Sequence, residues 1–309
     1  MKKILVIYFT QTGQARKAID AVLKPFLESG EYQVSYELIK PLKEFAYPWK
    51  YNEFMDAFPE NVQEVACPIQ PLKTSPDEHF DLIIISYQPW FLSVCRPIMS
   101  FLQSNEADLL LKDKKVITII NCRNMWMGAQ EKMKRKLKKL QANLVGNIVF
   151  PDHHANLTNL ITVLAFELKG VKEKFMGIFP KYGVDDKDLE KGHIAGEHIK
   201  NALEKSDFGK LQEQFVHLGL VEVKANLIIM EGRGQALFPL YAKYITKKGG
   251  EGSEARKTRV KIFGILLPTV IFIFSPIITI IARLTPFLAA SKIKKQMAYY
   301  QQNSLENCG

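Results

Sequence analysis

The sequence predicts a doubly wound α/β fold, in which helices cover both faces of one parallel sheet. Short, continuously apolar runs alternate with longer amphipathic runs through about the first two thirds of the chain. Such apolar runs are typical of strands that are buried on both faces. Hydrophobic residues make up 47% of the 309 residues and charged residues 24%, so the chain has enough apolar side chains for a full core.

Five runs are expected to form the sheet. They are residues 4–9, 32–39, 82–87, 116–121 and 144–150. Helical spacing fills most of the intervals and continues after the fifth run, and the expected helices are 13–28, 95–103, 128–141, 188–204 and 210–218. This alternation, with five strands, matches the flavodoxin type of doubly wound sheet. Residues 220–230 are a candidate for one more strand.

Two stretches go beyond a minimal fold of this type: the connection over residues 41–79 and the sequence that follows the fifth strand. The connection over residues 41–79 is long and rich in aromatic side chains. We expect it to form a packed cap, and a roof over an apolar substrate channel is the alternative. We therefore divide the chain into an α/β domain over 1–205, an extension of helix and strand over 206–250, and a tail over 251–309.

The tail contains the longest apolar stretch. Residues 262–282 include no charged side chain, and Lys and Arg side chains flank them on both sides. Their length would just span a hydrocarbon core. Pro268, Pro276 and the two basic flanks favour a broken hairpin, or a pair of helices that lies on the membrane surface. A buried core helix is the alternative.

The formal net charge of +10 is concentrated in that tail and in residues 131–140. Basic residues beside apolar sequence favour an anionic membrane surface over nucleic acid as a partner. The basic run at 132–139 is either a solvated helix face, a lipid-facing patch or a dock for an acidic acyl carrier protein.

Cysteine usage and the N-terminal residues indicate the compartment. The four cysteines have no paired or metal-like spacing, which suits a reducing compartment and predicts no metal site. Residues 1–3 run straight into a predicted strand, so we expect no signal peptide. We expect a cytoplasmic protein at the inner face of a bacterial membrane.

The first predicted strand ends in a loop that suits a phosphate group. The run is Thr10-Gln11-Thr12-Gly13-Gln14, with a helix expected from Gly13. Free backbone N–H groups and the helix dipole attract a phosphate there, and Gly13 lets the backbone approach it. The run resembles the phosphate loop of flavodoxins, although Ala15 replaces their last hydroxyl residue. We therefore expect FMN as the cofactor, and an ordinary strand-to-helix turn is the alternative.

Two later loops should lie beside this one, because the carboxyl ends of parallel strands meet at one edge of a sheet. Gln88-Pro89-Trp90-Phe91 follows the third strand and offers aromatic faces for a flavin ring. Asn121-Cys122-Arg123-Asn124, with Trp126, follows the fourth strand and offers amides and one cation. We expect Arg123 to stabilise negative charge on a reduced flavin. Core packing is the alternative for each aromatic residue.

Two histidines, His153 and His154, follow the fifth strand. A histidine in this position would move a proton in a flavin-coupled oxidation, so both are candidate catalytic residues with Arg123. A solvated loop is the competing interpretation.

The chain also resembles flavodoxin-like proteins of dialkylresorcinol and flexirubin-type pigment biosynthesis, a family labelled dialkylresorcinol condensing enzymes. The most distinctive motif is Cys-Arg-Asn-Met-Trp at 122–126. The other matching runs are 8–14, 87–93, 181–184, 231–234 and 275–278.

The resemblance implies that a separate ketosynthase builds a cyclohexanedione with two alkyl chains, and that this chain oxidises the ring to a dialkylresorcinol. Condensation itself would need an activated thiolate with His or Asn partners, and no cysteine lies in a recognisable nucleophile turn. We therefore expect an FMN-dependent oxidoreductase with a lipid-like substrate and a ketosynthase partner. The alternatives are a membrane-tethered electron carrier or quinone reductase, and a scaffold for the ketosynthase that has lost FMN.

Overall fold

The protein is described by a computed structural model that covers residues 1–152, 156–170, 176, 186–288 and 290–306. Five parallel strands form the main sheet in the order β2-β1-β3-β6-β7. The strands are β1 (Lys2–Tyr8), β2 (Tyr32–Leu38), β3 (Leu82–Tyr87), β6 (Lys115–Cys122) and β7 (Asn143–Pro151). This is the strand order of flavodoxin-like sheets, so the predicted fold class is confirmed, and each of the five strands predicted for the sheet is present.

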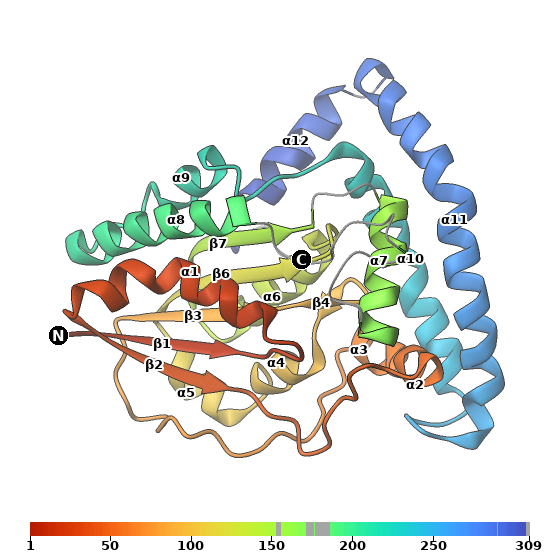
Figure 1. The fold of residues 1–309 in the computed structure, drawn as a ribbon, viewed down its shortest axis with the longest axis horizontal. Coiled ribbons are helices and arrows are strands. Elements are labelled where there is room, and N and C mark those ends of the chain that lie inside the picture. Colours follow the sequence, from red (N-terminus) through yellow and green to blue (C-terminus); the bar gives the residue numbers. More distant parts are fainter. Residues whose placement is uncertain (153–155, 171–175, 177–185, 289, 307–309) are drawn as a thin grey trace.

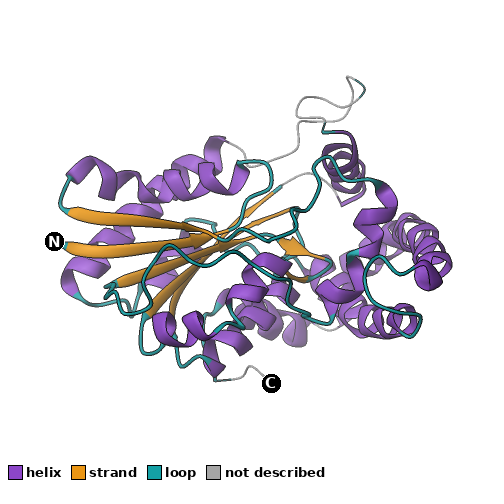
Figure 2. Cartoon of the chain, turned by 90° about the horizontal axis from the view of Figure 1, so that it is seen from below, coloured by secondary structure: helices purple, strands orange, loops and turns teal. Residues whose placement is uncertain are grey.

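Helices cover both faces of the sheet, which is buried between them (Figures 1 and 2). One face is covered by α1 (Gln14–Ser29), α8 (Asp186–Lys205) and α9 (Leu211–His217). The other is covered by α4 (Arg96–Phe101), α5 (Asn105–Leu111) and α6 (Met127–Lys139). Helices α1 and α8 pack closely because Gly196 has no Cβ, which would lie 2.1 Å from the carbonyl oxygen of Val22.

The long connection after β2 forms two short helices, α2 (Tyr51–Asp56) and α3 (Phe58–Val62). A small antiparallel hairpin, β4 (Pro89–Trp90) and β5 (Ser93–Val94), follows β3. Aromatic rings of the connection pack on the C-terminal helices, and the Phe58 ring stacks on that of Phe263 with centroids 3.9 Å apart. The aromatic connection therefore forms a packed cap.

A third group of helices lies at the end of the sheet where the strands finish (Figures 1 and 2). It comprises α7 (Asn156–Lys169), α10 (Ala225–Thr246), the 3-10 helix η1 (Glu254–Arg256) and α11 (Lys257–Leu288). Helix α12 (Ala290–Gln301) returns to the main body, where Met297 and Tyr300 pack against the core.

A buried ion pair fixes the start of α11 to the aromatic cap. Arg256 is fully buried, and its guanidinium pairs with Asp56 of α2 (Nε–Oδ1 2.7 Å) and with Glu60 of α3. Losing both carboxylates would leave a buried charge without a partner, which is strongly destabilising.

The strand proposed within residues 220–230 is wrong. The stretch makes one bond to the sheet, from the N–H of Val149 to the carbonyl oxygen of Leu220 (2.8 Å), and α10 then begins at Ala225. Leu227, Ile228 and Glu231 are its buried side chains here, a spacing that fits a helix and not a strand.

The predicted break of the tail at its prolines is also wrong, because α11 runs through both Pro268 and Pro276. A proline leaves the carbonyl four residues earlier without its helical donor. For Pro268 this carbonyl belongs to Gly264, and the hydroxyl of Tyr51 donates to it instead. Among the described residues, no helix combines the length and hydrophobicity needed to cross a membrane.

Candidate functional site

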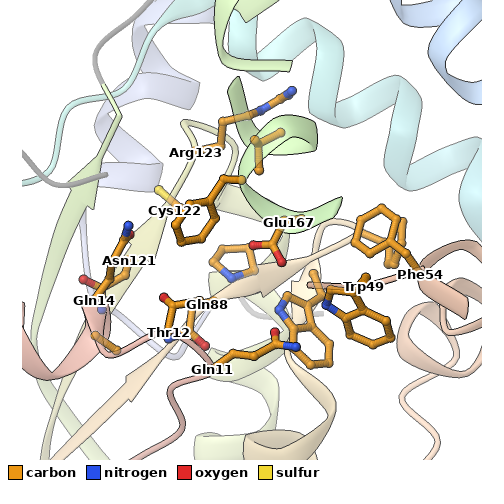
Figure 3. A pocket seen from close by; sticks show the side chains of 16 residues that line it. Gln11, Thr12, Gln14, Trp49, Phe54, Gln88, Asn121, Cys122, Arg123 and Glu167 are labelled. Atoms are coloured by element: carbon orange, nitrogen blue, oxygen red, sulfur yellow. The ribbon is translucent and has the colours of Figure 1, made fainter. Parts of the chain in front are cut away.

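A cavity of about 140 Å³ lies at the carboxyl ends of β1, β3 and β6 (Figure 3). Its walls come from the three loops singled out in the sequence, from the aromatic cap and from α7. This is where the strand order of the sheet reverses, which is the usual ligand position in doubly wound folds.

The loop after β1 leaves the start of α1 open to a ligand. Gly13 has a left-handed backbone (φ +84°), and its N–H donates to Oγ1 of Thr10 (2.9 Å). No side chain caps α1, and its first turn has no acidic residue. Thr12 and Gln14 line the cavity, whereas Thr10 holds the turn. An uncapped helix start next to donor side chains suits an anion.

Gln11 connects this loop to the aromatic cap. Its Nε2 donates to the carbonyl oxygens of Ala46 (2.8 Å) and Phe45 (3.3 Å). The residue lines the cavity, but its amide group is already committed to the cap. We therefore assign Gln11 to holding the wall in place.

The loop after β3 supplies the aromatic wall. Gln88, Pro89, Trp90 and Phe91 all line the cavity, and Nε2 of Gln88 donates to the carbonyl oxygen of Phe9 (2.9 Å). The Trp90 ring contacts Trp49 of the cap edge to face, with centroids 5.9 Å apart. These contacts make the aromatic wall a packed unit.

The hairpin turn in this loop is strained. Phe91 and Leu92 connect β4 to β5, with φ values of +48° and +60°. Two-residue turns of this kind usually contain Asn and Gly, because bulky residues rarely adopt positive φ. Strain of this type often occurs at functional sites. The side chains of Phe91 and Leu92 both become part of cavity walls in this conformation.

The end of β6 and the first loop residue after it supply polar groups. Asn121, Cys122 and Arg123 line the cavity. Nδ2 of Asn121 donates to Oγ of Ser86 (3.3 Å), while its Oδ1 is buried without a hydrogen-bond partner among the described residues. A ligand N–H that reached this oxygen would remove the cost of leaving it unpaired.

The two cysteines buried near the site remain thiols. Burial raises the pKa of Cys122 well above its ordinary value and raises that of Cys95 to about 12. Because the thiolate is the reactive form, neither side chain is an activated nucleophile.

Four predicted residues that the structure describes do not line the cavity, and two of them, Thr10 and Gly13, form the turn before α1. Trp126 is 2% exposed and belongs to the hydrophobic core, and Asn124 is also buried, so neither lines the cavity. His153 and His154 lie outside the described residues, as does the 181–184 motif.

Helix α7 was not recognised from the sequence as part of the site. Val163, Phe166 and Glu167 line the cavity, and the Glu167 backbone carbonyl accepts a hydrogen bond from the N–H of Trp49 (2.7 Å). Burial raises the pKa of the Glu167 carboxyl to about 7. An ordinary amphipathic pattern gave no signal for this role.

A second, apolar cavity of about 430 Å³ adjoins the first. The two share wall residues Phe54, Pro89, Phe91, Arg123 and Val163. Helices α10 and α11 supply much of the remaining wall. Its volume lies within the range of about 300–1,000 Å³ that is typical of small-molecule sites.

The site fits the phosphate and polar parts of FMN. The start of α1, Thr12 and Gln14 suit the phosphate, and the unpaired Oδ1 of Asn121 suits a ring N–H. The smaller cavity alone is below the size range of small-molecule sites. A ring system must therefore displace side chains of the aromatic wall or extend toward the apolar cavity.

The basic run on α6 is largely used inside the protein. Glu64 lies within 3.4–3.7 Å of the charged groups of Lys132, Arg135 and Lys136. Lys134 is 1% exposed and pairs with Glu131 (3.2 Å). This leaves few of its charges available to a partner.

No protein-family model and no curated protein matches the chain. A flavoprotein from Lactobacillus acidophilus NCFM in complex with FMN is similar at 16% identity and a TM-score of 0.39, covering 48% of this chain and 93% of its own. A flavodoxin from the domain Archaea is similar at 12% identity and a TM-score of 0.36, covering 65% of this chain and 99% of its own. A flavone reductase is similar at 14% identity and a TM-score of 0.35, and the match covers 66% of this chain and 64% of the reductase.

At these identities the likenesses carry no argument about activity. The strand order itself defines the class: this is a flavodoxin-like α/β protein with a candidate ligand site at the carboxyl edge of its sheet.

Proposed function

We propose that the chain binds FMN and is an oxidoreductase that acts on a lipid-like cyclohexanedione, which it converts to a dialkylresorcinol. One observation carries the cofactor assignment: the uncapped start of α1 shares a cavity with the loops after β3 and β6, at the switch point of the sheet.

Bound FMN would supply a two-electron acceptor. Thr12, Gln14 and the first amides of α1 would hold its phosphate, and Asn121 would orient its polar edge. Trp90 and Phe91 would keep water from the ring. Arg123, at the junction of both cavities, would stabilise developing negative charge.

The substrate class is supported by the apolar cavity. It adjoins the flavin candidate site and has room for an alkyl chain. The protonated thiols of Cys95 and Cys122 favour oxidation over condensation as the chemistry of this chain, so a separate ketosynthase would make the ring. The sequence resemblance supports the same division of labour.

The tail helix supports delivery of the substrate from a membrane. Exposed apolar side chains line α11, and they include Ile262, Ile265, Phe272, Ile273, Phe274 and Ile277. Phe274 and Val270 also line the apolar cavity, so its mouth lies on this face. Lys257, Arg259 and Lys261 precede the face and would attract anionic lipid at the inner membrane surface.

The first test is the absorbance spectrum of detergent-extracted protein, before and after addition of FMN. We expect bound oxidised flavin. A protein that stays colourless with FMN would refute the cofactor assignment and leave the scaffold role. The second test is anaerobic reduction of the bound flavin by a dialkylcyclohexanedione, with the dialkylresorcinol product detected by mass spectrometry.

A membrane-tethered quinone reductase or electron carrier is the second candidate, because the apolar cavity would also accept a quinone with a long side chain. Rapid NAD(P)H-dependent quinone reduction without dione oxidation would favour it.

A further inference from the structure

Glu167 has a special position in the smaller cavity. Of the described residues that line it, Glu167 is the single carboxylate and Arg123 the single cation. Glu167 lies one helical turn after Val163, which lines both cavities. Figure 3 shows the Glu167 side chain directed from α7 into the cavity. The carboxylate therefore lies near the point where the flavin site meets the apolar cavity.

The carboxylate has no bonding partner among the described residues, although the backbone of Glu167 is held by Trp49. Burial without compensation raises the pKa of Glu167 to about 7. The contrast is Glu231, whose pKa burial also raises to about 7 but whose carboxylate accepts the N–H groups of Met127 and Gly128 and lines neither cavity. The Glu231 carboxylate therefore holds the start of α6, whereas the Glu167 carboxylate lies in the cavity wall, where it could accept a proton from a ligand.

The titratable groups that surround Glu167 do not compete with it as a base. Cys122 remains a thiol because burial raises its pKa, and Arg123 is a permanent cation. Tyr47 has a buried hydroxyl without a partner among the described residues, and its pKa is raised to about 12 by burial and, secondarily, by the charge of Glu167. Tyr47 is therefore a proton donor at neutral pH and not an acceptor.

We infer that Glu167 is the catalytic base that removes a ring proton from the substrate in the proposed oxidation. The inference rests on the proposed function. The C–H bond next to a ring carbonyl breaks and its proton goes to the Glu167 carboxylate. The neighbouring C–H bond breaks and its hydride goes to oxidised flavin. A C=C bond forms between the two carbons, and tautomerisation gives the resorcinol.

Burial and position both suit this role. A base works best when its pKa lies near the working pH. Val163 and Phe166 precede Glu167 on α7 and add apolar side chains to the same cavity wall, which would limit loss of the proton to solvent.

The test compares the wild type with Glu167→Gln, Glu167→Asp and the control Glu190→Gln, which removes an exposed carboxylate on α8. Three quantities are measured on the full chain in detergent: the affinity for FMN, the anaerobic rate of flavin reduction by a dialkylcyclohexanedione across pH 5 to 9, and the carboxyl stretch by infrared spectroscopy. The infrared readout needs no turnover.

We expect Glu167→Gln to keep its FMN affinity, to reduce the flavin at least ~100-fold more slowly and to lose one of the two carboxyls that titrate near pH 7, leaving that of Glu231. Glu167→Asp should recover part of the rate, and Glu190→Gln should match the wild type. The wild-type rate should rise through pH 7, and this rise should vanish in Glu167→Gln.

The failures are distinguishable. A Glu167→Gln protein that reduces flavin at the wild-type rate overturns the base assignment alone. Loss of FMN binding in Glu167→Gln alone also overturns it, because Glu167 would then belong to the cofactor site. A wild type that binds no FMN, or that binds FMN but never oxidises the dione, overturns the proposed function and this inference together.

Discussion

The carboxylate of Glu231 on α10 accepts a hydrogen bond from the backbone N–H of Gly128 (Oε2···N 2.8 Å) and so caps α6 from another helix. The N–H of Met127 donates to the same carboxylate at 3.3 Å. Helix α6 begins at Met127, shortly after Asn121 at the end of β6 and Arg123 in the following loop. The contact therefore connects the C-terminal helices to the polar wall of the candidate site.

Glu231→Ala should destabilise the protein by about 2 kcal/mol, because it leaves buried N–H groups unpaired at the start of α6. Urea denaturation followed by circular dichroism measures the change. Glu213→Ala is the control, since this glutamate lies exposed on α9. Equal stability of the two variants would contradict a capping role.

Stability should fall as the pH rises from about 4.5 to 7. Burial raises the pKa of both Glu167 and Glu231 to about 7, from an ordinary value of 4.5. The folded protein therefore binds more protons than the unfolded chain in this window, and their stabilising effect is lost as the pH passes 7. A pKa that differs by one between the folded and unfolded states corresponds to about 1.4 kcal/mol of stability.

The measurement is the midpoint of thermal unfolding at pH 5 and pH 7.5. The double variant Glu167→Gln, Glu231→Gln should show a clearly smaller drop between the two values than the wild type. A drop of the same size in both proteins would show that other groups cause it.

Gly13→Ala should weaken FMN binding, and Gly30→Ala should not. Both glycines have positive φ, and a Cβ would meet no atom within 4 Å at either. Each substitution should therefore cost about 1–2 kcal/mol of stability through the backbone alone. At Gly13 the methyl group also blocks the approach of a phosphate to the start of α1.

The affinity for FMN, titrated by flavin fluorescence, separates the two effects. We expect at least a ~10-fold loss for Gly13→Ala at a stability matched by Gly30→Ala. Equal affinities would contradict a phosphate site at this loop.

The sheet and its three site loops were predictable from the sequence because they depend on local signals. Continuous apolar runs mark buried parallel strands, and their carboxyl ends meet at one edge by topology. Thr12, Trp90 and Asn121, which come from three separate stretches of the sequence, therefore line one cavity.

Glu167 and Glu231 were not predictable, because their roles depend on contacts across the chain. Glu231 meets Gly128 from 103 positions away, and nothing in either local pattern indicates the partner. The same holds for Tyr51, whose hydroxyl satisfies the carbonyl of Gly264 and allows α11 to pass Pro268 unbroken. Trp126 was predicted as a site residue but does not line the cavity, because its side chain packs in the hydrophobic core.

Gly234→Val should close part of the apolar cavity. A Cβ at Gly234 would lie 2.5 Å from Cδ1 of Leu92, and both residues line the cavity. The added side chain must therefore push Leu92 into ligand space. Because the added side chain takes volume from the cavity, binding of an alkyl chain should weaken ~10-fold, which corresponds to about 1.4 kcal/mol.

Gly232→Val is the matched control, because it adds the same side chain to α10 at an exposed position with no atom within 4 Å. Calorimetric titration with a dialkylresorcinol, together with FMN titration, should show weaker lipid binding with unchanged FMN affinity for Gly234→Val alone. Wild-type lipid affinity in Gly234→Val would mean that the chain binds elsewhere. Loss of both ligands would mean that the cavities behave as one site, because Phe91 and Arg123 form walls of both.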